Sequence, residues 1–132
     1  MLFSSVYGAN DEVKHRTMWN SLEAISKSVQ QRPWVLLLGD FNVVISPNEI
    51  LGGGFYKASA KAFGKCILNC LKSPGFYTWG NRRETSDFTI RKLDRILVNN
   101  DWIADISQSF GLFSSLGIFE HSNYIFFWCD QE

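Results

Sequence analysis

The chain has 132 residues, of which 45% are hydrophobic and 15% aromatic, enough for one domain with a buried core over residues 1–132. Its 13 basic side chains balance its 13 acidic ones, so no overall field draws the chain to nucleic acid or to an anionic membrane. No stretch nears the roughly 18 apolar residues of a membrane span and no signal sequence opens the chain. We therefore expect an intracellular domain, nuclear or cytoplasmic, that does not contact a membrane.

The first third of the sequence predicts a strand, a helix and a second strand. Residues 2–7 alternate loosely between apolar and polar. Asn10 or Asp11 can cap a helix whose apolar residues recur at spacings of three and four and which stops before Pro33. The uninterrupted apolar run at residues 35–38 then predicts a buried strand, and this order is typical of an α/β crossover.

A glycine run at residues 52–54 separates this unit from a second predicted helix. Apolar residues recur with helical spacing from Phe63 to Leu71, and the Ser-Pro-Gly at residues 73–75 ends the pattern. The later elements are expected to be strands at residues 76–79, 92–99, 108–115 and 124–129, with a short helical piece from Asp101.

The cysteines are odd in number and lack metal-ligand spacing with either histidine. Cys66 and Cys70 fall four residues apart at apolar positions of the second predicted helix, and Cys129 is the final residue of the last predicted strand. The pattern predicts reduced core residues rather than disulfides or a metal site.

Asp40 and Asn42 follow the buried strand, two residues apart. Side chains just past the carboxyl end of a strand in an open α/β sheet are well placed to meet a ligand. A carboxylate there can orient or deprotonate a water, and an amide can donate to a phosphate oxygen. A plain turn is the alternative, because glycine, aspartate and asparagine favour turns.

His121 stands between Glu120 and Ser122, and Asp94 lies within KLDRILVNN. One hypothesis has Asp94 accept a hydrogen bond from His121 and fix the orientation of the imidazole. The alternatives are an ordinary surface or core histidine and an ion pair of Asp94 with a neighbouring arginine. A contact between Asp94 and His121 would decide between them.

A basic segment surrounds two aromatic residues, Tyr77 and Trp79. Such interleaving suits a phosphate backbone and stacked bases, although a solvated turn with Glu84 and Asp87 as counter-charges explains it equally well. Tyr7 lies at the end of the first predicted strand. Its side chain either points into the cleft that these residues would form or packs against the rest of the domain. The basic residues of the segment are Arg82, Arg83, Arg91, Lys92 and Arg95.

Six segments occur in a fixed order: VYGAN, WVLLLGDFN, NEILGGG, GFYTWGN, RKLDRILVNNDW and EHS. In this order they resemble the endonuclease/exonuclease/phosphatase family, most closely the endonuclease domain of LINE-type non-LTR retrotransposons of plants. The resemblance covers nearly all of the chain. It implies a four-layer α/β sandwich of two mixed sheets flanked by helices, and hydrolysis of phosphodiester bonds in DNA with Mg²⁺, or with Mn²⁺ in its place.

The resemblance also implies roles for individual residues. Asp40 would activate the attacking water and Asn42 would bind a phosphate oxygen, while Tyr7 and Asn10 would contact the phosphate or the leaving oxygen.

Near the other end of the chain, Asp94 would pair with His121, which would stabilise charge on the phosphate. Glu120 stands where the family has a metal-binding aspartate. Three further residues of these motifs are expected to contact the substrate: Trp79, Asn81 and Arg95.

The sequence departs from the family at its start and at Glu120. The family has two strands before its counterpart of VYGAN, and these carry an asparagine and a metal-binding glutamate that this chain lacks. Glutamate at position 120 is also one methylene longer than the family's aspartate. We therefore expect the C-terminal part of the sandwich, with the N-terminal strands missing, an incomplete metal site, and little or no activity.

Two other functions stay open from the sequence. One is a non-catalytic module that binds nucleic acid through the basic segment, and the other is a non-functional relic of a gene copy. Removing half of a two-sheet sandwich would expose strand edges and apolar surface, so we also expect self-association.

Overall fold

The computed structural model of the chain describes residues 1–8, 11–29, 31–66, 69–70, 77–84, 86–114 and 120–129, with residues 35–39, 65–66 and 69–70 described by their backbone alone. In chain order the elements are β1 (Leu2–Ser4), α1 (Glu12–Ser28), β2 (Trp34–Asp40), the 3₁₀ turn η1 (Pro47–Glu49), β3 (Ile50–Leu51), α2 (Lys57–Cys66), β4 (Asn69–Cys70), β5 (Trp79–Gly80), β6 (Ile90–Arg91), β7 (Asp94–Val98), α3 (Asn100–Asp105), β8 (Ser109–Phe113) and β9 (Tyr124–Trp128).

The main sheet has the strand order β1-β2-β7-β4. β1 runs parallel to β2, with Leu2 opposite Trp34, and α1 connects the two strands as the predicted α/β crossover. β7 pairs antiparallel with β2, with Val35 opposite Val98, and places its other edge against β4. The chain therefore has a mixed α/β fold, as the sequence predicts.

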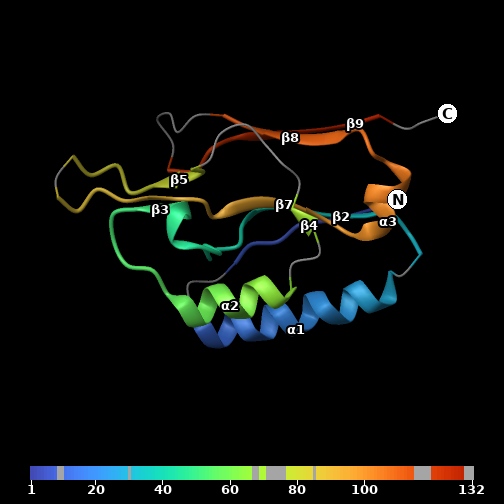
Figure 1. The fold of residues 1–132 in the computed structure, drawn as a ribbon, viewed down its shortest axis with the longest axis horizontal. Coiled ribbons are helices and arrows are strands. Elements are labelled where there is room, and N and C mark those ends of the chain that lie inside the picture. The colour runs from blue at the N-terminus through green and yellow to red at the C-terminus, as the bar shows by residue number, and fades with distance from the viewer. Residues whose placement is uncertain are drawn as a thin grey trace.

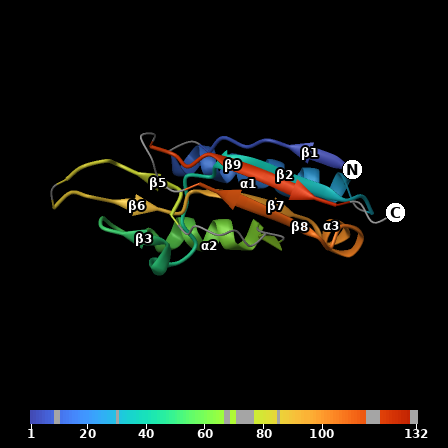
Figure 2. The same ribbon diagram turned by 90° about the horizontal axis from the view of Figure 1, so that it is seen from above.

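Two smaller antiparallel sheets complete the described part of the chain. One has the order β3-β6-β5, and the other is the β8-β9 hairpin. The hairpin covers the face of β2 and β7 opposite α1 and α2, so helices, main sheet and hairpin form successive layers (Figures 1 and 2). The four-layer sandwich and the absence of its N-terminal strands stay predictions from the family resemblance.

The second helix is shorter than its sequence pattern predicts. α2 ends at Cys66, and Asn69 and Cys70 instead pair with Val98 and Leu97 of β7. The reason is tertiary: the free edge of β7 offers backbone hydrogen bonds that a longer helix would leave unmade. The predicted helical positions Ile67 and Leu71 lie outside the described residues.

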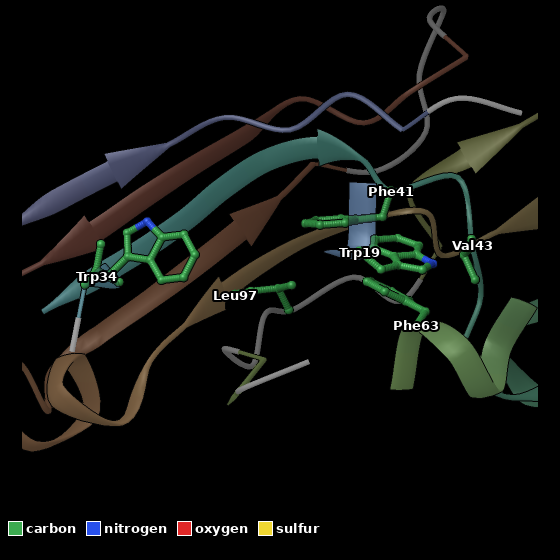
Figure 3. Packing of buried hydrophobic residues seen from close by; sticks show 7 residues of the cluster. Trp19, Trp34, Phe41, Val43, Phe63 and Leu97 are labelled. Carbon is green, nitrogen blue, oxygen red and sulfur yellow. The ribbon is translucent and has the colours of Figure 1, made fainter. Parts of the chain in front are cut away.

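One hydrophobic cluster joins the two long helices to the main sheet (Figure 3). Phe63 of α2 stacks on Trp19 of α1 with 4.6 Å between ring centroids, and lies 5.2 Å from the ring of Phe41 after β2. Because Phe41 and Phe63 are fully buried, this cluster fixes the end of β2, where Asp40 lies.

A second cluster lies between the main sheet and the hairpin. Ile96 and Val98 of β7 pack with Trp102, Ile106 and Phe113, so β7 is buried on both faces. β8 approaches β7 so closely that a Cβ at position 111 would overlap the side chain of Ile96, which explains the glycine there.

Cys129 is exposed, so the expectation that it is a core residue is wrong. The side chains of Cys66 and Cys70 lie outside the described part of the structure. None of the helices in the described ranges combines the length and the apolar character that a membrane crossing requires.

Candidate functional site

Asp40 ends β2 at a point where the pairing with β7 shifts in register and where Asp94 lies opposite it. The Oδ1 atom of Asp40 accepts a hydrogen bond of 2.7 Å from the backbone N–H of Asn42, and Asn42 adopts a left-handed conformation with φ of 57°. Asparagine tolerates this conformation better than most residues. Asp40 and Asn42 therefore form a turn, as the alternative interpretation of the sequence has it, and this turn also orients the Asp40 carboxylate.

Tyr7 is brought to this point by the glycine that follows it. The backbone N–H of Gly8 donates to the carbonyl oxygen of Asp40 at 2.5 Å, and a Cβ on Gly8 would lie 2.6 Å from the backbone of Phe41. Only glycine permits this approach. The Tyr7 side chain is 85% exposed, so it does not pack in the core.

Thr78 connects the two segments that carry the other polar residues of the site. Its hydroxyl oxygen accepts hydrogen bonds from the backbone N–H groups of Leu93 and Asp94 at 3.0 and 2.9 Å. Its carbonyl oxygen accepts from the N–H of Ser122 at 2.7 Å. Thr78 is fully buried and holds Asp94 beside the segment of His121. A single threonine next to a short strand carries no sequence pattern, so its role is not predicted from the sequence.

The imidazole of His121 lies between two carboxylates. Its Nδ1 atom is 3.0 Å from Oδ2 of Asp94, and its Nε2 atom is 3.8 Å from Oδ2 of Asp40. A carboxylate can only accept, so Nδ1 donates its hydrogen to Asp94. The contact on which the sequence hypothesis depended is present, and it turns Nε2 towards Asp40.

The pKa of Asp40 is raised above its ordinary value. Burial is the largest cause, and the nearby charge of Asp94 acts in the same direction. The hydrogen bond from Asn42 and the charge of His121 act in the opposite direction without cancelling the effect of burial. A carboxylate with a raised pKa is a stronger base when ionised, which suits proton abstraction from water.

These residues line a cavity of about 420 Å³. Its volume is in the range of cavities that take small ligands. Asp94 is buried behind His121. The lining residues are Tyr7, Asp40, Asn42, Trp79, Arg91, Leu93, Glu120 and His121.

Arg95, which the resemblance places in contact with substrate, lies in the core and is not among the residues that line this cavity. It is 2% exposed and forms a two-point ion pair with Glu49, with N–O distances of 2.9 and 2.5 Å. Burial alone would raise the pKa of Glu49, but hydrogen bonds from Arg95 and from the N–H of Ile45 lower it below its ordinary value.

Asn81 holds the loop between β5 and β6. Its Oδ1 accepts from the backbone N–H of Thr89 at 3.0 Å, and its Nδ2 donates to the carbonyl of Asp87 at 2.5 Å. It is not among the residues that line the cavity. Asn10 lies outside the described residues.

The basic residues of the segment from Arg82 to Arg95 do not lie together. Arg82 and Arg83 lie exposed in the β5–β6 loop, where Arg83 pairs with Asp87 at 3.6 Å, as the counter-charge alternative predicts. Among the described basic residues of this segment, Arg91 is the one that lines the cavity, so it adds positive charge where a phosphate would meet Asp40 and His121.

The described residues contain no group of three or more histidine, cysteine or acidic side chains arranged to hold a metal ion. Mg²⁺ does not require such a group, because it is usually held by one or two carboxylates together with water and substrate phosphate. Glu120 is an exposed carboxylate that lines the cavity, and it fits this mode of binding.

Comparison with known proteins adds no relative: no protein-family model, no curated protein sequence and no solved structure matches the chain.

Proposed function

We propose that this chain hydrolyses phosphodiester bonds of DNA, with Mg²⁺, in the manner of a retrotransposon endonuclease. The observation that carries the proposal is the placement of His121 between Asp94 and Asp40 at the wall of a cavity. The ordered motifs of the sequence add support, since six segments of the chain occur in the order that the family has.

The chemistry assigns Asp40 the task of orienting a water and taking its proton. The water oxygen forms the new bond to phosphorus, the bond to the leaving oxygen breaks in line with it, and that oxygen takes a proton from solvent. Asp94 holds the imidazole so that Nε2 of His121 can donate to a phosphate oxygen as negative charge develops there. The amide of Asn42 and the guanidinium of Arg91 supply further donors.

Glu120 would hold Mg²⁺ together with water and a phosphate oxygen. When bound, the ion would withdraw charge from the phosphate. Because glutamate places its oxygens farther from the backbone than the family's aspartate, we expect slow turnover.

A supercoiled-plasmid nicking assay tests the proposal. We expect Mg²⁺-dependent nicking by the wild-type chain, reduced about 10²- to 10⁴-fold by Asp40→Asn. Glu23→Gln is the matched control, because Glu23 lies on the exposed side of α1 in a surface pair with Lys27. Activity that Asp40→Asn leaves unchanged, or that a folded wild-type sample lacks, would contradict the proposal.

Binding of nucleic acid without catalysis is the second candidate. The exposed Arg82 and Arg83, close in sequence to the cavity residue Trp79, favour it. It predicts salt-dependent DNA binding that persists without Mg²⁺ and weakens when both arginines are changed to alanine. Nicking that depends on Asp40 would show that the chain does more than bind nucleic acid, and would exclude this second candidate.

A further inference from the structure

A second cavity adjoins the one described above. It has a volume of about 380 Å³, and two of its lining residues, Asn42 and Arg91, also line the cavity of Asp40 and His121. A ligand that occupies the first cavity can therefore extend past these side chains into the second. The residues of the second cavity are Glu12, His15, Asn42, Tyr56, Ser59 and Arg91.

His15 is the unexpected member of this set. It is only 7% exposed, yet neither ring nitrogen has a hydrogen-bond partner among the described residues. Its ring stacks on Trp19 with 5.6 Å between centroids, which fixes the plane of the imidazole. Leaving buried polar atoms unpaired costs stability, so these nitrogens are suited to a ligand that supplies the missing partners.

Arg91, which lines both cavities, also has a buried nitrogen, Nε, without a hydrogen-bond partner in the described part of the chain. A phosphate that lay between the cavities would meet a donor that is already desolvated. The charge of His15 also lowers the pKa of Asp40 slightly, so the two cavities are close enough to interact electrostatically.

The remaining lining residues indicate which part of a nucleotide fits. The Glu12 carboxylate repels a second phosphate, but it can accept a hydrogen bond from an amino group, and Ser59 holds it in place through a 3.1 Å bond to Oε1. Tyr56 is 67% exposed and offers a ring on which a base can stack. The imidazole of His15 can donate and accept at the edge of a base.

We propose that the second cavity binds the base of the nucleotide next to the scissile phosphate. It favours adenine or cytosine over thymine, because only the first two present an exocyclic amino group to Glu12. Tyr56 stacks on the base, His15 pairs with its edge, and Arg91 holds the phosphate that joins the two positions. This inference rests on the proposed function and adds a base preference to it.

The chain has two histidines, one in each cavity, so NMR of the imidazole Hε1–Cε1 groups reports on both cavities at once. We expect 2′-deoxyadenosine and 2′-deoxycytidine 5′-monophosphates to shift the signals of both His15 and His121. Inorganic phosphate should shift His121 alone, and thymidine 5′-monophosphate should bind about tenfold more weakly than the adenine nucleotide.

The outcomes separate this inference from the proposed function. A shift of His121 without His15 overturns the base cavity but leaves the phosphate site, whereas a shift of His15 alone supports the base cavity and contradicts the phosphate site. Shifts at neither histidine overturn the inference, as does equal binding of all three nucleotides.

Two variants examine the assigned contacts. Glu12→Gln keeps the acceptor for Ser59 and is expected to remove most of the preference over thymidine, while Tyr56→Ala weakens all three nucleotides about tenfold. Glu23→Gln on the same helix is the control. Far-UV circular dichroism checks the fold of each variant, and unchanged nucleotide binding by folded Glu12→Gln and Tyr56→Ala would overturn the proposed contacts.

Discussion

At the scale of single residues, the site is defined by carboxylates whose surroundings differ. Asp40 is buried and has a raised pKa, which favours its protonated form in the folded chain. Glu49 is equally buried, but Arg95 and a backbone N–H hold its pKa below the ordinary value. The first carboxylate thus costs stability when ionised and is available for chemistry, whereas the second contributes stability and belongs to the core.

Asp40→Asn is expected to stabilise the fold while it slows nicking. A pKa raised by folding means that stability falls as pH rises from the ordinary carboxyl pKa through the folded pKa, and asparagine avoids this loss. We expect a gain of about 1 kcal/mol in the free energy of unfolding at neutral pH, and a much smaller gain at acid pH below the ordinary carboxyl pKa. Urea denaturation at both pH values measures it; a destabilised variant at neutral pH would contradict the argument.

Glu49→Gln is expected to destabilise the fold by about 3–5 kcal/mol, because it leaves the buried guanidinium of Arg95 without a counter-charge. Wild-type stability from this pair is present above the ordinary glutamate pKa and is lost as pH falls through the lowered folded pKa. Thermal denaturation over this pH range tests both statements. The double variant Glu49→Gln, Arg95→Met is the control and should cost less than Glu49→Gln alone.

At the scale of elements, the short strands position the site more than the long helices do. β5 is two residues long, yet the adjoining Thr78 joins the start of β7 to the segment of His121 through the hydrogen bonds of its hydroxyl and carbonyl groups. Thr78 is a positioning residue, since it acts through Asp94 and does not line the cavity.

Thr78→Val keeps the shape of the side chain but leaves the backbone N–H groups of Leu93 and Asp94 unpaired. We expect a loss of about 2–4 kcal/mol of stability and a fall in the nicking rate larger than that of Thr78→Ser, which retains the oxygen. The His121 Hε1–Cε1 signal should shift in the valine variant, because Asp94 moves relative to the imidazole. An unchanged signal would mean that Thr78 matters only for stability.

At the scale of the whole molecule, the described layers leave one apolar sheet face uncovered. Phe113 and Gly111 of the hairpin face the main sheet, whereas the alternate residues of β8 and β9 point away from it. On this outer face Phe110 stacks on Phe127 with 4.9 Å between ring centroids. The exposed fractions are 50% for Phe110, 39% for Leu112, 56% for Ile125 and 42% for Phe127.

We expect the chain to self-associate through this face, because contiguous apolar surface of this kind drives association. Sedimentation velocity should reveal concentration-dependent dimers or larger species, which the double substitution Ile125→Lys, Phe127→Lys reduces. Ile103→Lys on α3 is the control, since Ile103 is 45% exposed but lies outside the hairpin. A wild-type chain that is monomeric at every concentration would contradict this expectation.

The sequence by itself determined the local structure of this protein. Asp11 caps α1, the apolar run after Pro33 forms β2, and the last two predicted strands are β8 and β9. These features depend on neighbours within a few residues, where capping and periodicity act. The hypothesis of a contact between Asp94 and His121 also came from the sequence, from the chemistry of the two side chains and from the order of the motifs.

Only the tertiary structure decided which of these polar groups meet. Asp94 and His121 are 27 residues apart, and the chain between them includes a strand and a helix whose packing brings the two side chains together. Packing also buries the side chain of Arg95 in the core. It ends α2 at Cys66 and places His15 beside the second cavity. Sequence patterns specify which face of an element is apolar, but the partner of that face, and the polar groups carried with it, depend on how the layers pack.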